Sequence, residues 1–149
     1  MSAIGMSARW GLPLLAVGQM QKEVTHNEAL TLIDVLIAPL AEARGINTPP
    51  PTPQLGQCWI VGIAPTGAWT GSEQQLACWT SGGWRMIRPR AGMVVRLTSG
   101  AMLRFDGVIW LDPPAIATPV GGTAIDIEAR AAVAALITAL RGQGWLEQI

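Results

Sequence analysis

The middle of the chain, residues 56–111, alternates short apolar runs with turn-forming residues. Five of the seven tryptophans and the only phenylalanine lie in this stretch. Gly, Pro, Ser and Asp interrupt the runs at close intervals, which is typical of short antiparallel strands joined by tight turns. Segments 76–84 and 102–110 each have a strand-turn-strand pattern, and Asp106-Gly107 favours a type I′ hairpin turn. The pattern therefore predicts a small antiparallel β-domain.

A helical pattern precedes this β-domain. Apolar residues recur at helical spacing in the second half of residues 19–38, and a polar run occupies the first half. We predict a helix over residues 19–38. Pro39 should kink or end the helix, although residues 40–43 still favour helix, and Gly45 is a natural stop.

A second helix is predicted over residues 126–141. Thr123 is the better N-cap candidate, with Asp126 three residues later completing a box-like start. Asp126 and Arg130 are four residues apart and can form an ion pair, and Gly142 ends the helix.

The apolar positions of this second helix alternate spacings of four and three, as in a heptad repeat. Two interpretations stay open: the helix packs on its own β-domain, or it joins copies of the chain. The predicted oligomerisation positions are Val133, Leu136 and Leu140.

These elements give an α+β fold: an N-terminal helix, a small antiparallel Trp- and Gly-rich β-domain of hairpins, and a C-terminal helix. Pro-rich residues 47–53 form a stiff linker. We predict an N-terminal arm and helix over residues 1–46. The antiparallel β-domain occupies residues 47–114, and a linker with the oligomerisation helix occupies residues 115–149.

Composition changes the expected partners. Half of the residues are hydrophobic, only 13% are charged, and the formal net charge is zero. So low a charge content indicates that the chain buries part of its surface against partners. The sequence has no basic stripe, so it gives no support for nucleic-acid binding. The arginines between residues 85 and 104 spread over several predicted strands. The apolar run at residues 11–17 is too short to span a membrane and makes a poor signal peptide. We expect synthesis in the cytoplasm and no membrane insertion.

The two cysteines and the single histidine offer little chemistry. Cys58 and Cys78 lack metal spacing, and we interpret them as two buried thiols, with a cross-strand disulfide as the alternative. His26 has no second histidine for a metal site and no nucleophile to activate. Asp106 and Asp112 are interpreted as turn residues rather than as a catalytic carboxylate pair. We therefore predict no enzymatic activity, no catalytic residue, no metal site and no cofactor.

Polar residues surround most of the first helix, and each can donate or accept hydrogen bonds. A helix that packs against protein on several sides buries its polar groups, and each buried polar group needs a hydrogen-bond partner. A helix face in water has no such need. We interpret the run as a docking surface, with a solvated helix face as the alternative. The predicted docking residues are Gln19, Lys22, Glu23, His26, Asn27 and Glu28.

The tryptophans have two interpretations. Trp59, Trp79 and Trp110 are expected in the core. Trp69 lies on a loop between two glycines, and we predict that it is an exposed platform on which a sugar ring could stack.

The run GQMQKEVTHNEAL at residues 18–30, followed by Asp34, resembles the signature of a family of phage-derived proteins of alphaproteobacteria. These proteins, of unknown function, occur in prophages and gene transfer agents. The similarity covers roughly residues 11–111, through the Gly-Trp elements and the 105–110 hairpin. Trp59 occupies a position where the family more often has Tyr, so this chain lacks the tyrosine hydroxyl there. Many related proteins carry a further C-terminal module, whereas this sequence goes almost directly from the β-domain to its last predicted helix.

This resemblance implies a structural virion protein, a head-spike or tail-fibre-like component at the particle surface that takes part in attachment to host polysaccharide. It implies other virion proteins, such as capsid, spike or fibre proteins, and host capsular polysaccharide as partners. A carbohydrate-binding module without a fixed structural role is the alternative. Because fibre-like proteins commonly wind around a three-fold axis, we predict a homotrimer, with a pentamer as the alternative.

Overall fold

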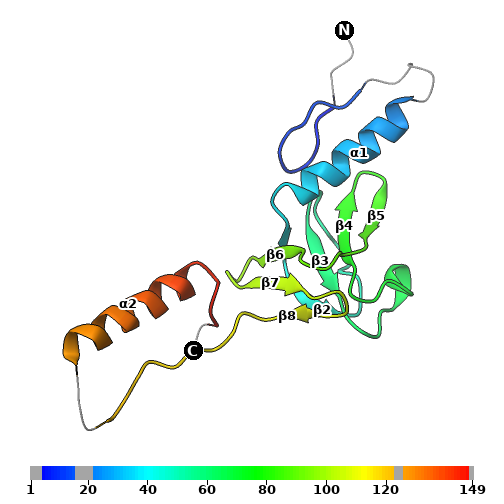
Figure 1. Cartoon of the computed structure of the whole chain (residues 1–149). Helices are drawn as coiled ribbons and strands as arrows, with labels where there is room; N and C mark the ends of the chain where they lie inside the picture. The colour runs from blue at the N-terminus through cyan, green and yellow to red at the C-terminus, as the bar shows by residue number, and fades with distance from the viewer. Residues whose placement is uncertain (1–4, 16–21, 123–125, 148–149) are drawn as a thin grey trace. The chain divides into compact units, whose positions relative to one another are not determined.

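A computed structural model describes residues 5–15, 22–122 and 126–147 of the chain. The described residues contain two α-helices and eight short strands, which confirms the predicted α+β fold class. They group into two compact units that meet in sequence between Pro89 and Arg90. This boundary lies inside the predicted 47–114 β-domain, and the three-part division stays a prediction. Figure 1 shows the elements along the chain.

The first unit combines one helix with a four-stranded sheet. The sheet has the order β2-β3-β4-β5, in which β2 runs parallel to β3 and the other neighbours are antiparallel. A 3-10 turn, η1, lies between β3 and β4. The elements are α1 (Lys22–Leu36), β1 (Leu40–Ala41), β2 (Arg44–Ile46), β3 (Cys58–Val61), η1 (Gly67–Trp69), β4 (Leu76–Thr80) and β5 (Gly83–Ile87).

The predicted hairpin around Ser81-Gly82 is confirmed as β4 and β5. Trp79 pairs directly with Trp84, and Thr80 pairs with Gly83 at the turn. Gly83 has a φ of 93°, a left-handed conformation that residues with a Cβ adopt only at a cost. The turn glycine therefore sets the register that brings the two tryptophans together.

Residues 40–43, whose composition favours helix, are not helical. Helix α1 ends at Leu36, three residues before Pro39, and residues 40–46 form the short strands β1 and β2. The Ile60 N–H donates to the Ala43 carbonyl, and the Gly62 N–H donates to the Ile46 carbonyl. Backbone hydrogen bonds to β3 here outweigh the local helix propensity of the segment.

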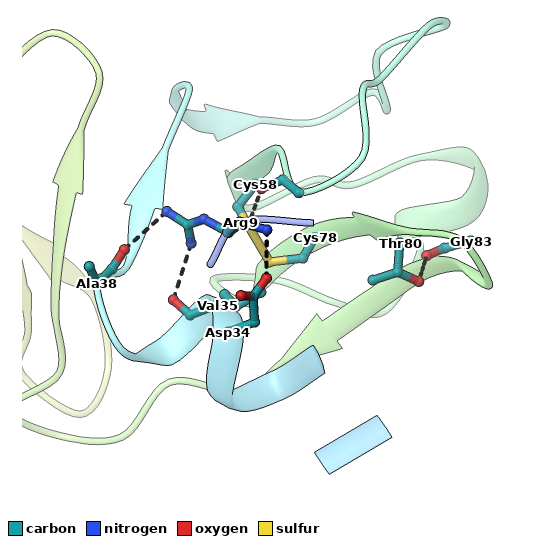
Figure 2. The surroundings of a disulfide bond; sticks show 9 residues. Arg9, Asp34, Val35, Ala38, Cys58, Cys78, Thr80 and Gly83 are labelled. Carbon is teal, nitrogen blue, oxygen red and sulfur yellow. Dashed lines mark hydrogen bonds between the residues drawn. A yellow bond between two sulfur atoms is a disulfide. The ribbon is translucent and has the colours of Figure 1, made fainter. Parts of the chain in front are cut away.

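The two cysteines form a disulfide, so the interpretation as separate thiols is wrong (Figure 2). Cys58 on β3 and Cys78 on β4 are directly opposite each other in the antiparallel ladder, and both are buried. Residue spacing alone does not reveal this register, which places the two side chains on the same face of the sheet.

The second unit contains a small sheet and the second helix. Strand β6 (Val94–Leu97) pairs with β7 (Met102–Phe105), and β7 pairs with β8 (Trp110–Leu111), both antiparallel. Val95, Leu103, Phe105 and Trp110 are buried on one face of this sheet. Helix α2 (Ile127–Gly142) follows a long irregular segment.

The Asp106-Gly107 turn joins β7 and β8, but it is not the predicted type I′ turn. Gly107 has a φ of 118°, whereas Asp106 is not in the left-handed region. The loop instead has four residues, because Phe105 pairs with Trp110. The Asp106 carboxylate accepts hydrogen bonds from the N–H groups of Val108 and Ile109, at 2.7 and 2.8 Å. The side chain therefore organises the loop as an Asx turn.

Helix α2 is capped by Asp126 rather than by Thr123, which lies outside the described residues. Asp126 has an extended backbone, and its carboxylate accepts a hydrogen bond from the Ala129 N–H at 2.8 Å. The Arg130 guanidinium donates to the Gly121 carbonyl. Gly142 is the last helical residue, in agreement with the predicted end. Among the described helices, neither is long and apolar enough to cross a bilayer.

Candidate docking surface

The N-terminal arm, residues 5–15, is a small hairpin bound to α1 by a buried carboxylate. Met6 bridges to Pro13 across the arm. Asp34 of α1 is only 2% exposed. Its carboxylate accepts hydrogen bonds from the Ser7 hydroxyl at 2.7 Å, the Arg9 N–H at 2.9 Å and the Trp10 N–H at 2.7 Å. These three donors compensate the cost of burying the charge and fix the tip of the arm.

Arg9 extends from the arm to the end of α1, as Figure 2 shows. Its guanidinium donates to the carbonyls of Val35 at 3.1 Å and Ala38 at 3.0 Å. A cation at this position satisfies carbonyls that the helix end leaves without partners, and it complements the helix dipole. Burial lowers the pKa of the Arg9 guanidinium, and the charges of Asp34 and Glu42 oppose that effect. A Cβ at Gly56 would lie 2.9 Å from Arg9 Cγ, so the loop before β3 also packs against the arm.

Asn27 of α1 forms hydrogen bonds with the other end of the arm, at Leu15. Its side-chain oxygen accepts a hydrogen bond from the Leu15 N–H at 2.9 Å, and its amide donates to the Leu15 carbonyl at 3.0 Å. This paired contact mimics a β-ladder and satisfies both polar groups of one backbone residue. The polar run on α1 thus has a partner within the chain, the arm.

A groove of about 410 Å³ lies between α1 and the β4–β5 hairpin. The Glu28 carboxylate and the Arg85 guanidinium form an ion pair, 2.5 Å apart, that links helix to hairpin. Both side chains are about half exposed, so solvent screens the pair. We call this groove the docking groove; it is lined by Leu14, Val24, Asn27, Glu28, Thr31, Leu32, Thr80, Ser81, Gly82, Arg85 and Met86.

The remaining predicted docking residues have different environments. His26 is exposed and makes an interaction within the chain. Glu23 is half-buried, and its Oε2 atom is buried without a hydrogen-bond partner among the described residues. Lys22 begins α1, and Gln19 lies outside the described residues. The structure therefore brings Asn27 and Glu28 to the docking groove and leaves their role in docking a prediction.

The prediction that Trp69 is an exposed platform is wrong. Its side chain is fully buried in a cluster with Trp59, Val61 and Ala77. The Trp69 ring lies 6.4 Å from that of Trp59 and 5.0 Å from that of Trp84, in tilted and edge-to-face geometry. The flanking glycines permit the tight 3-10 turn that directs the ring inward. Trp59 and Trp110 are buried as predicted, and Trp79 is half-buried.

The predicted oligomerisation residues are exposed on α2. The side chains of Val133, Leu136 and Leu140 are 41%, 63% and 43% exposed, and Ile137 is the buried residue of the helix. A helix normally buries its apolar stripe, because leaving it in water forfeits about 25 cal/mol per Å². The stripe on α2 is therefore available to another chain.

Sequence reasoning missed two kinds of residue here. Ser7 and Arg9 lie in the predicted N-terminal arm, for which no contact was predicted, and Asp34 appeared only as the last residue of a motif. A polar residue inside the apolar half of a helix is the signal that could have identified Asp34. Among the described residues, no group of three or more His, Cys, Asp and Glu side chains could hold a metal ion.

Comparison with protein families gives one match, described as "Protein of unknown function (DUF2793)", over residues 26–111. These residues are more than half of the chain. They include most of α1 and every strand of both units, whereas the arm and α2 lie outside them. Comparison with curated proteins gives no match.

Proposed function

We propose that this chain, which belongs to the DUF2793 family of proteins of unknown function, is a structural virion protein of a phage-like particle. It acts as a spike or fibre component at the particle surface and takes part in attachment to host polysaccharide. The resemblance of residues 18–30 to proteins of prophages and gene transfer agents supports the proposal that the chain is part of a phage-like particle. The proposal includes no catalytic step.

The exposed apolar stripe of α2 is the observation that carries the assembly part of this proposal. Three of its side chains, Val133, Leu136 and Leu140, lie within one helical face and are 41% to 63% exposed. Two or more copies could bury this face against one another in a coiled-coil seam. We propose a homotrimer through α2, with a pentamer as the alternative arrangement.

The docking groove supports contact with a second virion protein. It is lined by apolar side chains such as Val24 and Leu32 and by polar ones, among them the paired Glu28 and Arg85. An apolar floor with a few polar groups is typical of recognition sites. We therefore propose that the groove seats a segment of another particle protein.

Incorporation of variants into particles tests the groove. Reversing the charge in Glu28→Arg should lower the amount of chain in purified particles, and the double variant E28R/R85E should restore it if the pair positions the hairpin. His26→Ala should also weaken incorporation, whereas Glu73→Ala, an exposed residue of the same unit, should not. Wild-type incorporation of E28R would contradict the groove as a docking site, and wild-type incorporation of H26A would contradict docking through the rest of the polar run.

The alternative function is a carbohydrate-binding module without a fixed structural role. Trp145, which is 58% exposed, favours it as a possible stacking surface. The two functions differ in one measurement: a module that only binds sugar would be absent from purified particles, whereas a virion protein is present in fixed copy number.

A further inference from the structure

The outward face of the β6–β7–β8 sheet carries a pocket that the docking groove does not involve. Val94 lies directly opposite Arg104 in the ladder, and Arg104 lies opposite Leu111, so these three side chains share one face. The pocket has a volume of about 340 Å³, within the range of small-ligand sites. Its lining includes Val94, Met102, Arg104, Leu111, Asp112 and Trp145.

Trp145 lies at this pocket on a backbone that is fixed on both sides. The Met102 N–H donates to the Gly144 carbonyl at 3.1 Å, and the Glu147 N–H donates to the Pro114 carbonyl at 3.0 Å. Gly144 has a φ of 76°, and a Cβ there would collide with the Gly100 carbonyl. The neighbours Gly144 and Leu146 are buried, whereas the indole between them is 58% exposed. The segment is thus anchored while its large aromatic ring faces solvent.

Two charged groups of opposite sign accompany the indole. Arg104 is exposed on β7, and Asp112 directly follows β8. A guanidinium offers a planar fork of donors that matches a carboxylate, and an ionised carboxylate accepts hydrogen bonds from hydroxyls. One cation balanced by one anion gives no attraction for a nucleic-acid backbone, which needs several cations.

We propose that this pocket binds one pyranose unit of an acidic polysaccharide. The C–H groups on one face of the sugar ring pack on the electron-rich face of Trp145. Arg104 pairs with the carboxylate of a uronic acid unit, and Asp112 accepts hydrogen bonds from ring hydroxyls. The inference deepens the proposed function, on which it rests, because it places the polysaccharide contact at Trp145 instead of at the buried Trp69.

Titration of the purified protein tests the site directly. A hyaluronan hexasaccharide supplies alternating uronic acid units, and cellohexaose is a neutral probe of equal length. The ¹⁵N resonance of the Trp145 indole should shift with both probes, and the acidic probe should bind more tightly at low salt, because screening weakens an exposed ion pair.

Matched variants give the expected magnitudes. Trp145→Ala should weaken binding at least about 10-fold, as removal of an aromatic hot spot does. Trp10→Ala removes an indole that is 55% exposed on the arm of the other unit and should leave binding unchanged. Arg104→Gln should abolish the preference for the acidic probe and leave cellohexaose binding unchanged.

Three results would overturn the site. The first is no shift of the Trp145 indole with either probe up to about 10 mM, a concentration that detects even weak binding. The second is equal loss of affinity in W145A and W10A. The third is an acidic preference that persists in R104Q.

A particle experiment separates this site from the proposed function. Particles that contain W145A in normal amount but attach poorly to cells would support both. Particles that contain W145A and attach normally would contradict the site alone, and particles that lack the wild-type chain would contradict the proposed function alone.

Discussion

The two helices of this protein have nearly the same length but opposite relations to the rest of the chain. Helix α1 has 15 residues and is bound through Asp34 and Asn27 to the N-terminal arm. Helix α2 has 16 residues, one buried side chain and an apolar stripe in water. Helix α1 also exposes apolar residues such as Val24 and Ile33, but its Asp34 and Asn27 side chains have partners in the arm. The difference supports the proposal that another copy of the chain covers the stripe on α2, whereas α1 is bound within the chain.

The largest effect on folding stability is expected at Asp34. Replacing Asp34 by Ala leaves the Ser7 hydroxyl and the N–H groups of Arg9 and Trp10 without their acceptor. Loss of one partner from a buried charged network costs about 4 kcal/mol. Thermal and urea unfolding measure this loss, and limited proteolysis should show cleavage in the arm.

Asp126→Gly is the matched control for D34A, because it removes a carboxylate from an exposed cap of the other helix with a loss of only a few tenths of a kcal/mol. If D34A costs less than about 1 kcal/mol, the hydrogen bonds of the arm are not what anchors it to α1.

A substitution at Leu136 tests whether the exposed apolar stripe of α2 binds another copy of the chain. Leu136 is 63% exposed in the single chain, so Leu136→Asp should change the stability of the isolated chain by no more than about 0.5 kcal/mol. In an assembled seam the same change buries an unpaired carboxylate and costs about 3 kcal/mol per interface. Light scattering at micromolar concentration should therefore show trimers for the wild-type chain and monomers for L136D.

Ala131→Asp places the same charge away from the stripe on α2, because residues 131 and 136 lie about 140° apart on the helix. It should leave the trimer intact. If L136D instead unfolds the chain and leaves association unchanged, α2 is a core element and not an oligomerisation helix.

The alanine variant of the α2 cap has an intermediate effect. Asp126→Ala removes the acceptor for the Ala129 N–H and should destabilise the helix by about 1 kcal/mol. Because a trimer would order α2, the loss should be visible in the helical circular dichroism of the L136D monomer and smaller in the assembled chain. Equal losses in both forms would contradict stabilisation of α2 by association.

The smallest effect on stability is expected in the loop between β7 and β8, which lies outside both helices and serves as a reference for them. Hydrogen bonds from the N–H groups of Ile109 and Val108 hold the pKa of Asp106 below its ordinary value. A lowered folded pKa contributes stability that is present above about pH 4 and is lost as the pH falls through the folded pKa. Asp106→Asn should lower stability slightly at pH 7 and remove this part of the acid dependence, so that the stabilities of the wild type and D106N converge as the pH falls below about 4. Glu73→Gln, which removes a different carboxylate, is the control. If the stability of D106N depends on pH in the same way as that of E73Q, this role of the Asp106 carboxylate is contradicted.

The sequence predicts local structure well where the signal is local. Gly83 and Ser81 mark the β4–β5 turn, and the apolar spacing with Asp126 and Gly142 bounds α2 within a residue or two. The strands within residues 40–46 were not predicted, because pairing of Arg44 with Ile60 is a long-range contact that local helix propensity does not reveal.

The contacts of the candidate sites depend on register and on distant partners. Asp34 binds residues 24 to 27 positions away in sequence, so its role follows only from the folded arm. The Cys58–Cys78 disulfide depends on strand register. Trp69 and Trp145 both follow small residues, and only the 3-10 turn and the anchored C-terminal segment decide that one is buried and the other exposed.

Localisation of the chain by cryo-EM in purified phage-like particles tests the central claim most directly. The account predicts density for this chain at the particle surface, in three copies around a symmetry axis, with the Val133, Leu136 and Leu140 faces of the α2 helices against one another. Five copies at a capsid vertex would select the pentamer. Particles that lack the chain, or that carry it as a single copy with the α2 stripe in solvent, would contradict a structural virion protein assembled through α2.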